Sequence, residues 1–264
     1  MLHQKNVMMQ FRFGCVLLAQ LVFSGLVSAQ VALNHVVLAQ FETELSDVIE
    51  LIGGEQVKVK LAEVEAAYLE DSSVGNRLRL GLIYHEVALN LTFLDPTDAY
   101  AGYALKCVDM LKALAADSNT RPEAMVFIES YLASALSLMA AETKKLKLLG
   151  EAFDLFDIAV QRYSHASPRP EFMRGSVAEN LPWIMWRKRK YARIDFTSII
   201  AKQEAQPGYA DFRVMSFSYW AWAKAHSSRK HRAKALQYLN RAIALDPHYK
   251  AGRQRAEDLK ASWE

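Results

Sequence analysis

Cysteine is scarce in this chain, so disulfide bonds within the chain are not expected to stabilise it. The only cysteines among the 264 residues are Cys15 and Cys107, and removal of the first 29 residues would leave Cys107 alone. Such a domain depends on its hydrophobic core, and about 235 residues are enough to build one. The composition agrees, because 52% hydrophobic against 23% charged residues is typical of an ordered globular chain.

Acidic residues are missing from the first 41 positions, where the basic residues are limited to Lys5 and Arg12. The apolar stretch that follows them ends in Val27-Ser28-Ala29, whose small residues suit a signal peptidase. This order of features is typical of an export signal. We therefore predict a signal peptide over residues 1–29, cleavage after Ala29, and a periplasmic or secreted mature protein.

An uncleaved inner-membrane anchor over residues 13–35 is the alternative. A membrane-spanning helix needs roughly 20 apolar residues, and no Lys, Arg, Asp or Glu interrupts the chain between Phe13 and Phe41. Asn34 and His35 count against this alternative. Contact with a membrane is expected only if this segment stays uncleaved.

A strong excess of positive charge is also missing. Removal of residues 1–29 lowers the formal net charge from +3 to +1, whereas a general nucleic-acid binder keeps a marked basic excess. We therefore expect no nucleic acid among the partners.

Motifs for catalysis or cofactor binding are absent as well. Gly53-Gly54 is not followed by the Gly-Lys-Ser/Thr of a phosphate loop, no Gly-x-Ser-x-Gly occurs, and His85-Glu86 lacks the second histidine of a zinc-protease helix. Cys107 lies on the apolar side of a predicted helix, which favours a buried thiol over a nucleophile. We expect no metal, no cofactor and no enzymatic activity.

Good helix formers fill the long segments between the seven prolines. The predicted fold class is therefore all-α. Residues 30–73 are predicted to form N-terminal helices, the first from about Leu33 to Ile52 and the second from about Glu55 to Leu69. The alternation of apolar residues and lysines over 53–61 leaves a strand open as an alternative for that segment.

One complete helical hairpin is predicted from Phe217 to Tyr249. Its spacing of small and large apolar residues and its closing Pro247 resemble a tetratricopeptide repeat. Matching positions are Tyr219, Trp222 and Ala223 in the first helix and Ala235, Leu239 and Ala242 in the second. His226 occupies a place where the family usually has Tyr.

Looser matches precede this hairpin. Leu80, Gly81 and Tyr84 repeat the spacing of a first helix, where glycine lets the paired helix approach closely. The expected partner helix runs from about Thr97 to Leu114 and packs through Ala101, Leu105 and Val108. Thr120 and Glu123 stand at the spacing of a capping box, and the helix they open carries Phe127, Tyr131, Leu132 and Leu136.

Further matches are Ala152, Phe156 and Ala159 in one second helix and Ala192, Phe196 and Ile199 in the next. A shorter first helix through Phe172, Gly175 and Ala178 lies between them. The equivalent alanines 152, 192 and 235 are 40 and 43 residues apart, longer than the 34 of a regular array.

The resemblance implies a divergent, right-handed α-solenoid of about four helix hairpins over residues 74–264, with a charged capping helix from Tyr249 to Trp263. Members of this family bind peptides or proteins in a concave groove lined by the first helices, and they seldom catalyse reactions. The positions that would face such a groove here are His85, Phe172, Glu179, Phe217, Trp220 and Lys224, together with Leu78 and Leu82. Trp220 either contacts a partner or packs on N-terminal helices folded into the groove.

The densest charge is the run Arg187, Lys188, Arg189 and Lys190, flanked by Trp183, Trp186 and Tyr191. Such a basic edge could meet phosphate, anionic lipid head groups or an acidic partner. Alternatively, it is the solvated start of a helix with the tryptophans packed beneath. A second group, Arg229-Lys230-His231-Arg232, occupies the equivalent turn of the next hairpin.

The sequence thus favours an exported scaffold that binds a protein or peptide through its concave face. Two alternatives come from other classes: an accessory subunit of a solute-transport system that binds a small ligand, and a hydrolase whose site has no recognised motif.

Overall fold

The computed structural model describes residues 30–49, 53–92 and 98–263. Those residues form eleven α-helices and two short 3-10 helices, and no strand occurs among them. The all-α prediction is confirmed, and the segment that left a strand open is helical. The predictions for residues 1–29 lie outside the described residues.

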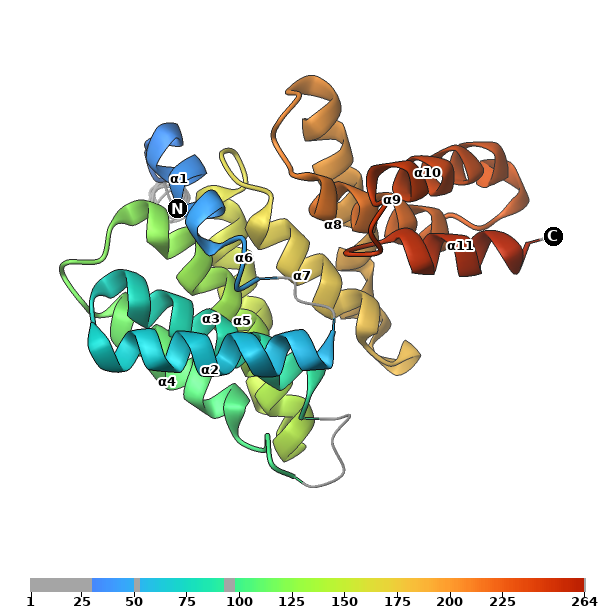
Figure 1. Cartoon of the computed structure of the whole chain (residues 1–264). Coiled ribbons are helices and arrows are strands. Elements are labelled where there is room, and N and C mark those ends of the chain that lie inside the picture. Colours follow the sequence, from blue (N-terminus) through green and yellow to red (C-terminus); the bar gives the residue numbers. More distant parts are fainter. Residues whose placement is uncertain (1–29, 50–52, 93–97, 264) are drawn as a thin grey trace, which may run out of the picture.

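The elements follow one another along the chain as Figure 1 labels them. Their bounds are α1 His35–Leu45, α2 Gly54–Glu70, α3 Val74–Asn90, α4 Tyr103–Ala115, α5 Pro122–Thr143, α6 Leu146–Tyr163, α7 Arg169–Asn180, η1 Trp183–Met185, α8 Trp186–Ala205, α9 Phe212–Ala225, η2 Arg229–His231, α10 Arg232–Leu245 and α11 Arg253–Ala261.

Local chemistry explains several helix starts. The Asn34 side chain accepts hydrogen bonds from the backbone N–H groups of Val36 and Val37 at α1, and Asp211 accepts one from Val214 at α9. These side chains satisfy amide donors that the first turn leaves unpaired. Pro122 opens α5 in the first turn, where a missing N–H costs nothing.

Two expectations for the helix ends were wrong. The first helix ends at Leu45 rather than near Ile52, because the chain turns over residues 46–49 and buries Val48 and Ile49 outside it. The next helix, α2, begins at Gly54. The capping box is also absent, because Thr120 Oγ1 donates to Leu114 O at 2.7 Å and Glu123 binds elsewhere.

The packing face predicted for α4 was wrong for two residues. Ala101 precedes the helix, which begins only at Tyr103, and Leu105 is 49% exposed. The face that packs is instead Ala104, Cys107, Val108 and Leu111. Because the later start shifts the buried stripe, Val108 alone of the expected three lies on it.

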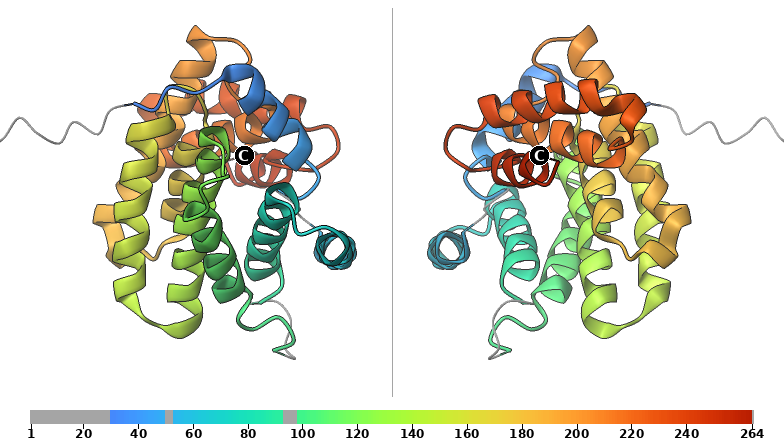
Figure 2. Two further views of the ribbon diagram at one scale, coloured as in Figure 1. Left: turned by 90° about the vertical axis from the view of Figure 1, so that its left-hand side faces the viewer. Right: turned by 90° about the vertical axis from the view of Figure 1, so that its right-hand side faces the viewer.

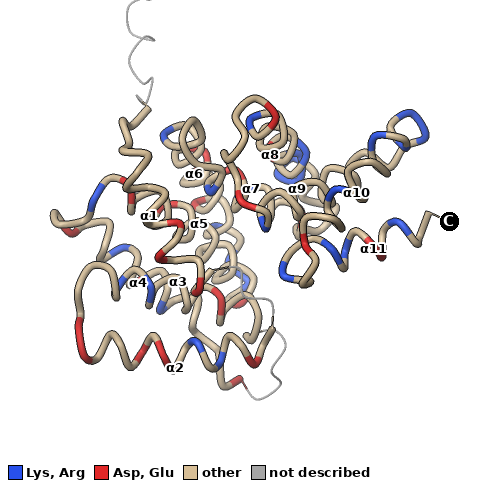
Figure 3. Tube along the Cα trace, turned by 45° about the horizontal axis from the view of Figure 1, so that its top comes forward, with Lys and Arg blue, Asp and Glu red and all other residues tan. Residues whose placement is uncertain are grey.

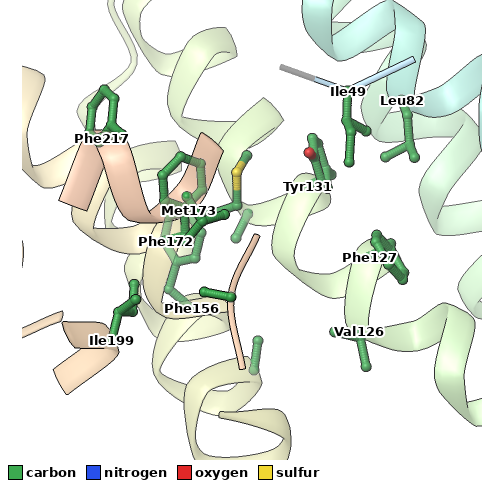
Figure 4. Packing of buried hydrophobic residues seen from close by; sticks show 14 of the residues in the cluster. Ile49, Leu82, Val126, Phe127, Tyr131, Phe156, Phe172, Met173, Ile199 and Phe217 are labelled. Atoms are coloured by element: carbon green, nitrogen blue, oxygen red, sulfur yellow. The ribbon is translucent and has the colours of Figure 1, made fainter. Parts of the chain in front are cut away.

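From α2 to α11 each α-helix packs against the next, and α3, α5, α7, α9 and α11 also contact one another in that order. Figure 2 shows the resulting row of neighbouring helices from two sides. One hydrophobic core runs through the row. Figure 4 shows part of it, with Ile49 of the N-terminal segment among the buried residues of later helices.

The small positions of the predicted hairpins lie where helices come close. A Cβ atom at Gly81 would be 2.7 Å from Leu111 Cδ2, and one at Gly175 would be 3.0 Å from Phe196 Cζ. Ala152, Ala235 and Ala242 are fully buried. His226 stacks on Trp222 with ring centroids 3.9 Å apart, so it fills the aromatic place by ring contact.

Candidate functional site

Residues 31–49 lie across α3, α5, α7 and α9, and we call the side of these helices that they cover the inner face. The segment begins with a backbone bond from Val31 N to Arg162 O at 3.3 Å. Asn34 N then donates to Glu123 Oε1 of α5 at 2.9 Å. Farther along, the Phe41 ring packs 6.3 Å from the Phe127 ring. In Figure 2 the segment is the blue part of the chain.

Arginines from α3 and α9 hold the end of α1. Arg79 donates through Nη1 to Glu44 O at 2.6 Å and pairs in a fork with both oxygens of Asp47 at 2.8 Å. Arg213 Nη1 donates to Ser46 O at 2.9 Å and to Ile49 O at 3.3 Å. Both side chains thus satisfy carbonyl groups at or just beyond the end of the helix, where such groups lack partners.

A third arginine comes from the first turn of α7. Arg169 is 1% exposed, and its Nη2 donates to Glu42 Oε2 of α1 at 2.7 Å. Its guanidinium group also lies 5.9 Å from the centre of the Phe127 ring. A guanidinium group buried to this degree needs a paired anion, and α1 supplies it.

The ion pair at Asp47 changes the acidity of its carboxyl group. The hydrogen bond from Arg79 is the main cause, and it lowers the pKa of Asp47 below its ordinary value against the opposing effect of burial. The N-terminal segment is therefore held by charge as well as by apolar contact.

A pocket of about 480 Å³ lies between α1 and the starts of α7 and α9. Apolar groups such as Leu38 and Val214 form part of its wall, and Glu42 and Arg169 supply its charged pair. Tyr209 also lines it, with its hydroxyl donating to Ser164 O at 2.8 Å. Burial raises the pKa of Tyr209, so this hydroxyl stays protonated.

Five of the six residues predicted for a groove come together along α7 and α9. The Phe217 ring lies 5.5 Å from Phe172 and 5.0 Å from Trp220, and Lys224 forms an ion pair with Glu179. Trp220 is only 8% exposed. Sequence reasoning missed Arg255 of α11, which lies 5.1 Å over both the Phe217 and Trp220 rings.

This aromatic group belongs to the packing between α7, α9 and α11. The described ring contacts of Trp220 come from Phe217, Lys224 and Arg255 rather than from the N-terminal helices. Arg255 was overlooked because α11 was interpreted as a polar cap. Its position three residues before Asp258 in a strongly charged helix gives no sign of the contact.

His85, the sixth residue, lies apart in a buried polar network. Its Nε2 is 2.8 Å from Ser134 Oγ of α5, and its Nδ1 is 3.2 Å from Glu86 Oε1. This order of groups is that of a nucleophile, base and orienting acid. All three residues are less than 5% exposed, however, and both described pockets are lined by other residues.

Cys107 is likewise unsuited to attack a substrate. The thiol is fully buried, and burial raises its pKa so that the reactive thiolate is disfavoured. Over the described part of the chain no group of three or more His, Cys, Asp or Glu residues is placed to hold a metal ion.

The basic run lies at the start of α8, whose Ala192, Phe196 and Ile199 are buried, but the expectation for the tryptophans was wrong. Trp183 of η1 is 78% exposed and Trp186 is 66% exposed, so the tryptophans are not packed beneath the helix. Trp183 begins η1 and Trp186 begins α8, so both lie in the α7–α8 connection. Lys188 folds back, with its Nζ 4.7 Å over the Phe153 ring of α6.

Comparisons of the chain with protein-family models, with curated proteins and with solved structures give no match. One described helix, α5, is long and apolar enough to cross a membrane, but 72% of its apolar window is buried inside the protein. A core helix passes the same test, so α5 is weak evidence for a membrane span.

Proposed function

We propose that this chain is an exported, tetratricopeptide-like α-solenoid scaffold that binds a protein or peptide partner through its inner face. Successive helix pairs with contacts between every second helix support the solenoid. The observation that carries the binding proposal is the N-terminal segment itself. Residues 31–49 lie across four first helices and are held there in the manner of a peptide ligand.

The contacts of that segment define what the inner face recognises. Arg79 and Arg213 bind backbone carbonyl groups, which any helix end offers, while Arg169 binds a carboxylate. Phe127 supplies an apolar contact. The best partner is therefore a short helix that carries an aromatic residue followed by acidic residues, with its carboxyl end between α3 and α9.

In this proposal the N-terminal segment competes with the partner for the inner face. An occupied site lowers the apparent affinity for a second ligand by the fraction of molecules that are free. Weakening the segment should therefore strengthen binding of a peptide added from outside.

A labelled peptide of residues 31–49 tests this competition. Phe41→Ala removes an aromatic contact from the chain's own segment, and the variant is expected to bind the peptide about tenfold more tightly than the wild type. Adding Arg79→Ala and Arg213→Ala to that variant should abolish the gain. Arg193→Ala, an exposed arginine on α8, is the matched control and should leave binding unchanged.

Affinity capture from the cell envelope then tests the partner. A captured protein that the 31–49 peptide displaces supports the proposal. Peptide affinity that is the same in the wild type and Phe41→Ala contradicts it.

A second candidate, a small-ligand subunit of a transport system, is favoured by one observation. The pocket beside α1 measures about 480 Å³, within the range of about 300–1,000 Å³ of small-molecule sites. Native mass spectrometry of the protein purified from its own cells distinguishes the two. A retained small molecule that Val214→Trp removes would favour the transport subunit.

We further propose that the chain acts without catalysis. The Ser134–His85–Glu86 network has a hydrolytic order but is buried on α3 and α5, and this burial favours a structural role. A fluorophosphonate probe is expected to leave Ser134 unlabelled. Labelling that His85→Ala abolishes would instead establish the hydrolase alternative.

A further inference from the structure

The turns inside three successive hairpins carry positive charge only. We call the segments 143–147, 181–191 and 226–234 together the turn edge. They contain eleven lysines and arginines and no aspartate or glutamate. The described remainder of the chain mixes both signs, so this concentration is a property of the turn edge rather than of the composition.

The three turns are neighbours in space. Lys188 of the second turn lies over Phe153 of α6, and Lys224 beside the third turn pairs with Glu179 just before the second. In Figure 1 the α5–α6 turn lies at the bottom of the molecule, the α7–α8 turn at the lower right and the α9–α10 turn at the right. Figure 3 shows the blue α9–α10 turn projecting at the far right.

Most of these cations have no carboxylate partner among the described residues. Lys147 pairs with Glu151 at 3.4 Å. Nearby acids are engaged elsewhere, since Glu142 accepts from Gly102 N and Glu179 pairs with Lys224. The cations without a described ion pair include Lys144, Lys145, Arg187, Lys190, Arg229 and Lys230.

Large exposed apolar side chains lie among these cations. Trp183, Ile184 and Trp186 are 78%, 68% and 66% exposed. Leu146, between two lysines of the first turn, is 66% exposed. The Arg187 guanidinium group lies 5.4 Å over the Trp186 ring, so aromatic and cation stand together.

We propose that the turn edge binds the surface of a bilayer rich in anionic phospholipid. Tryptophan favours the level of the lipid head groups, where its ring is buried and its N–H stays hydrated. Juxtaposed lysines and arginines add attraction to anionic lipid over about one Debye length. The inference does not depend on the partner of the inner face.

The geometry favours a bilayer over an acidic protein. The apolar groups stand at the turns, as isolated anchors, and the cations extend over three hairpins. Neither described pocket is lined by them. The head groups of a fluid anionic bilayer can move to pair with cations in any arrangement. An acidic protein would need a matching rigid surface of comparable length.

Vesicle co-sedimentation tests the proposal, with the protein isolated after export by its own cell. The wild type is expected to bind vesicles of phosphatidylcholine with phosphatidylglycerol and to bind pure phosphatidylcholine much more weakly. Binding should fall as salt rises, because exposed charges are screened. Every variant has the same N-terminus, so any contribution of that end to vesicle binding is the same in all of them.

Variants on the turn edge should weaken binding in proportion to what they remove. Trp183→Ala with Trp186→Ala is expected to lower affinity at least about tenfold, and Arg187→Ala with Lys190→Ala about fivefold per cation. The matched controls are Val59→Ala with Leu69→Ala, two exposed apolar residues of α2, and Lys250→Ala. They should change affinity less than about twofold.

Because all these side chains are exposed, thermal melts should confirm that each variant folds. The proposal is overturned if the double tryptophan variant binds anionic vesicles like the wild type, or if neutral and anionic vesicles bind equally. It is also overturned if an acidic polyglutamate peptide binds the turn edge while anionic vesicles do not, since an acidic protein would then be the partner.

Discussion

The inner face and the turn edge are both rich in arginine and aromatic residues, but they differ in how the charge is paired. On the inner face Arg79 and Arg169 each have a carboxylate partner, and Arg213 binds two carbonyl groups. At the turn edge the tryptophans are exposed and most cations lack a described ion pair. Charge that is paired internally holds the fold together, whereas unpaired charge is available to an external partner.

Burial explains why the two regions should respond differently to mutation. Removing one member of a buried ion pair leaves the other charge in a poorly solvated place, which costs far more than the pair contributes. Removing an exposed cation costs little, because water already solvates it. The difference can be measured with single substitutions.

Arg174→Ala should have the largest effect on stability. Arg174 is 7% exposed, and it donates to both oxygens of Asp195, at 2.9 Å from Nε and 2.6 Å from Nη2. Its loss leaves Asp195 buried and unpaired, so the free energy of unfolding should fall by about 3–5 kcal/mol. Urea denaturation measures this change.

Arg187→Ala at the turn edge is the matched control for that measurement, with an expected change within about 0.5 kcal/mol. A double variant, Arg174→Ala with Asp195→Ala, should recover part of the lost stability because neither charge is then left alone. If Arg174→Ala and Arg187→Ala destabilise the protein equally, burial and pairing do not set Arg174 apart from the cations of the turn edge.

Gly81→Ala should have a smaller effect, which tests packing rather than charge on the inner helices. The new Cβ would lie 2.7 Å from Leu111 Cδ2, so α3 and α4 would have to move apart. We expect this to lower the free energy of unfolding by about 1–3 kcal/mol. Gly75→Ala on the same helix meets nothing within 4 Å and should instead stabilise by about 0.5–1 kcal/mol. Thermal melts compare them, and similar melting temperatures would contradict the close approach.

The sequence predicted those features that are decided within one helix or between adjacent helices. Ala152, Phe156 and Ala159 are all fully buried as expected, because their spacing alone places them on one stripe. Gly81 also lies at a close approach, as its place in the hairpin predicts.

Features set by distant residues could not be predicted in the same way. Glu123 binds Asn34, 89 residues away, instead of closing a local cap, and Arg213 binds Ser46, 167 residues away. No local spacing encodes such pairs, so the position of residues 31–49 across the inner face was missed. The exposure of Trp183 depends on the short 3-10 helix η1 between α7 and α8. The spacing of apolar residues along the sequence does not predict such a connection.

The smallest expected effect is the dependence on pH of the ion pair between Arg79 and Asp47 of the N-terminal segment. Because Arg79 lowers the pKa of Asp47 in the folded protein, the ionised carboxyl stabilises the fold. That contribution is complete above the ordinary pKa of 3.8 and is lost as the pH falls through the lowered folded value. The carboxyl group is 43% exposed, so we expect less than about 1 kcal/mol.

Urea denaturation of the wild type and Asp47→Asn from pH 7 downward isolates this contribution. The wild type should be the more stable at neutral pH, and the difference should vanish below the folded pKa, because both side chains are then uncharged. Asp109→Asn, at an exposed carboxyl on α4, controls for the loss of one negative charge. If the two stability curves stay parallel over the whole pH range, Arg79 contributes through the Glu44 carbonyl alone. The inner face would then select partner helices by their ends rather than by their acidic residues.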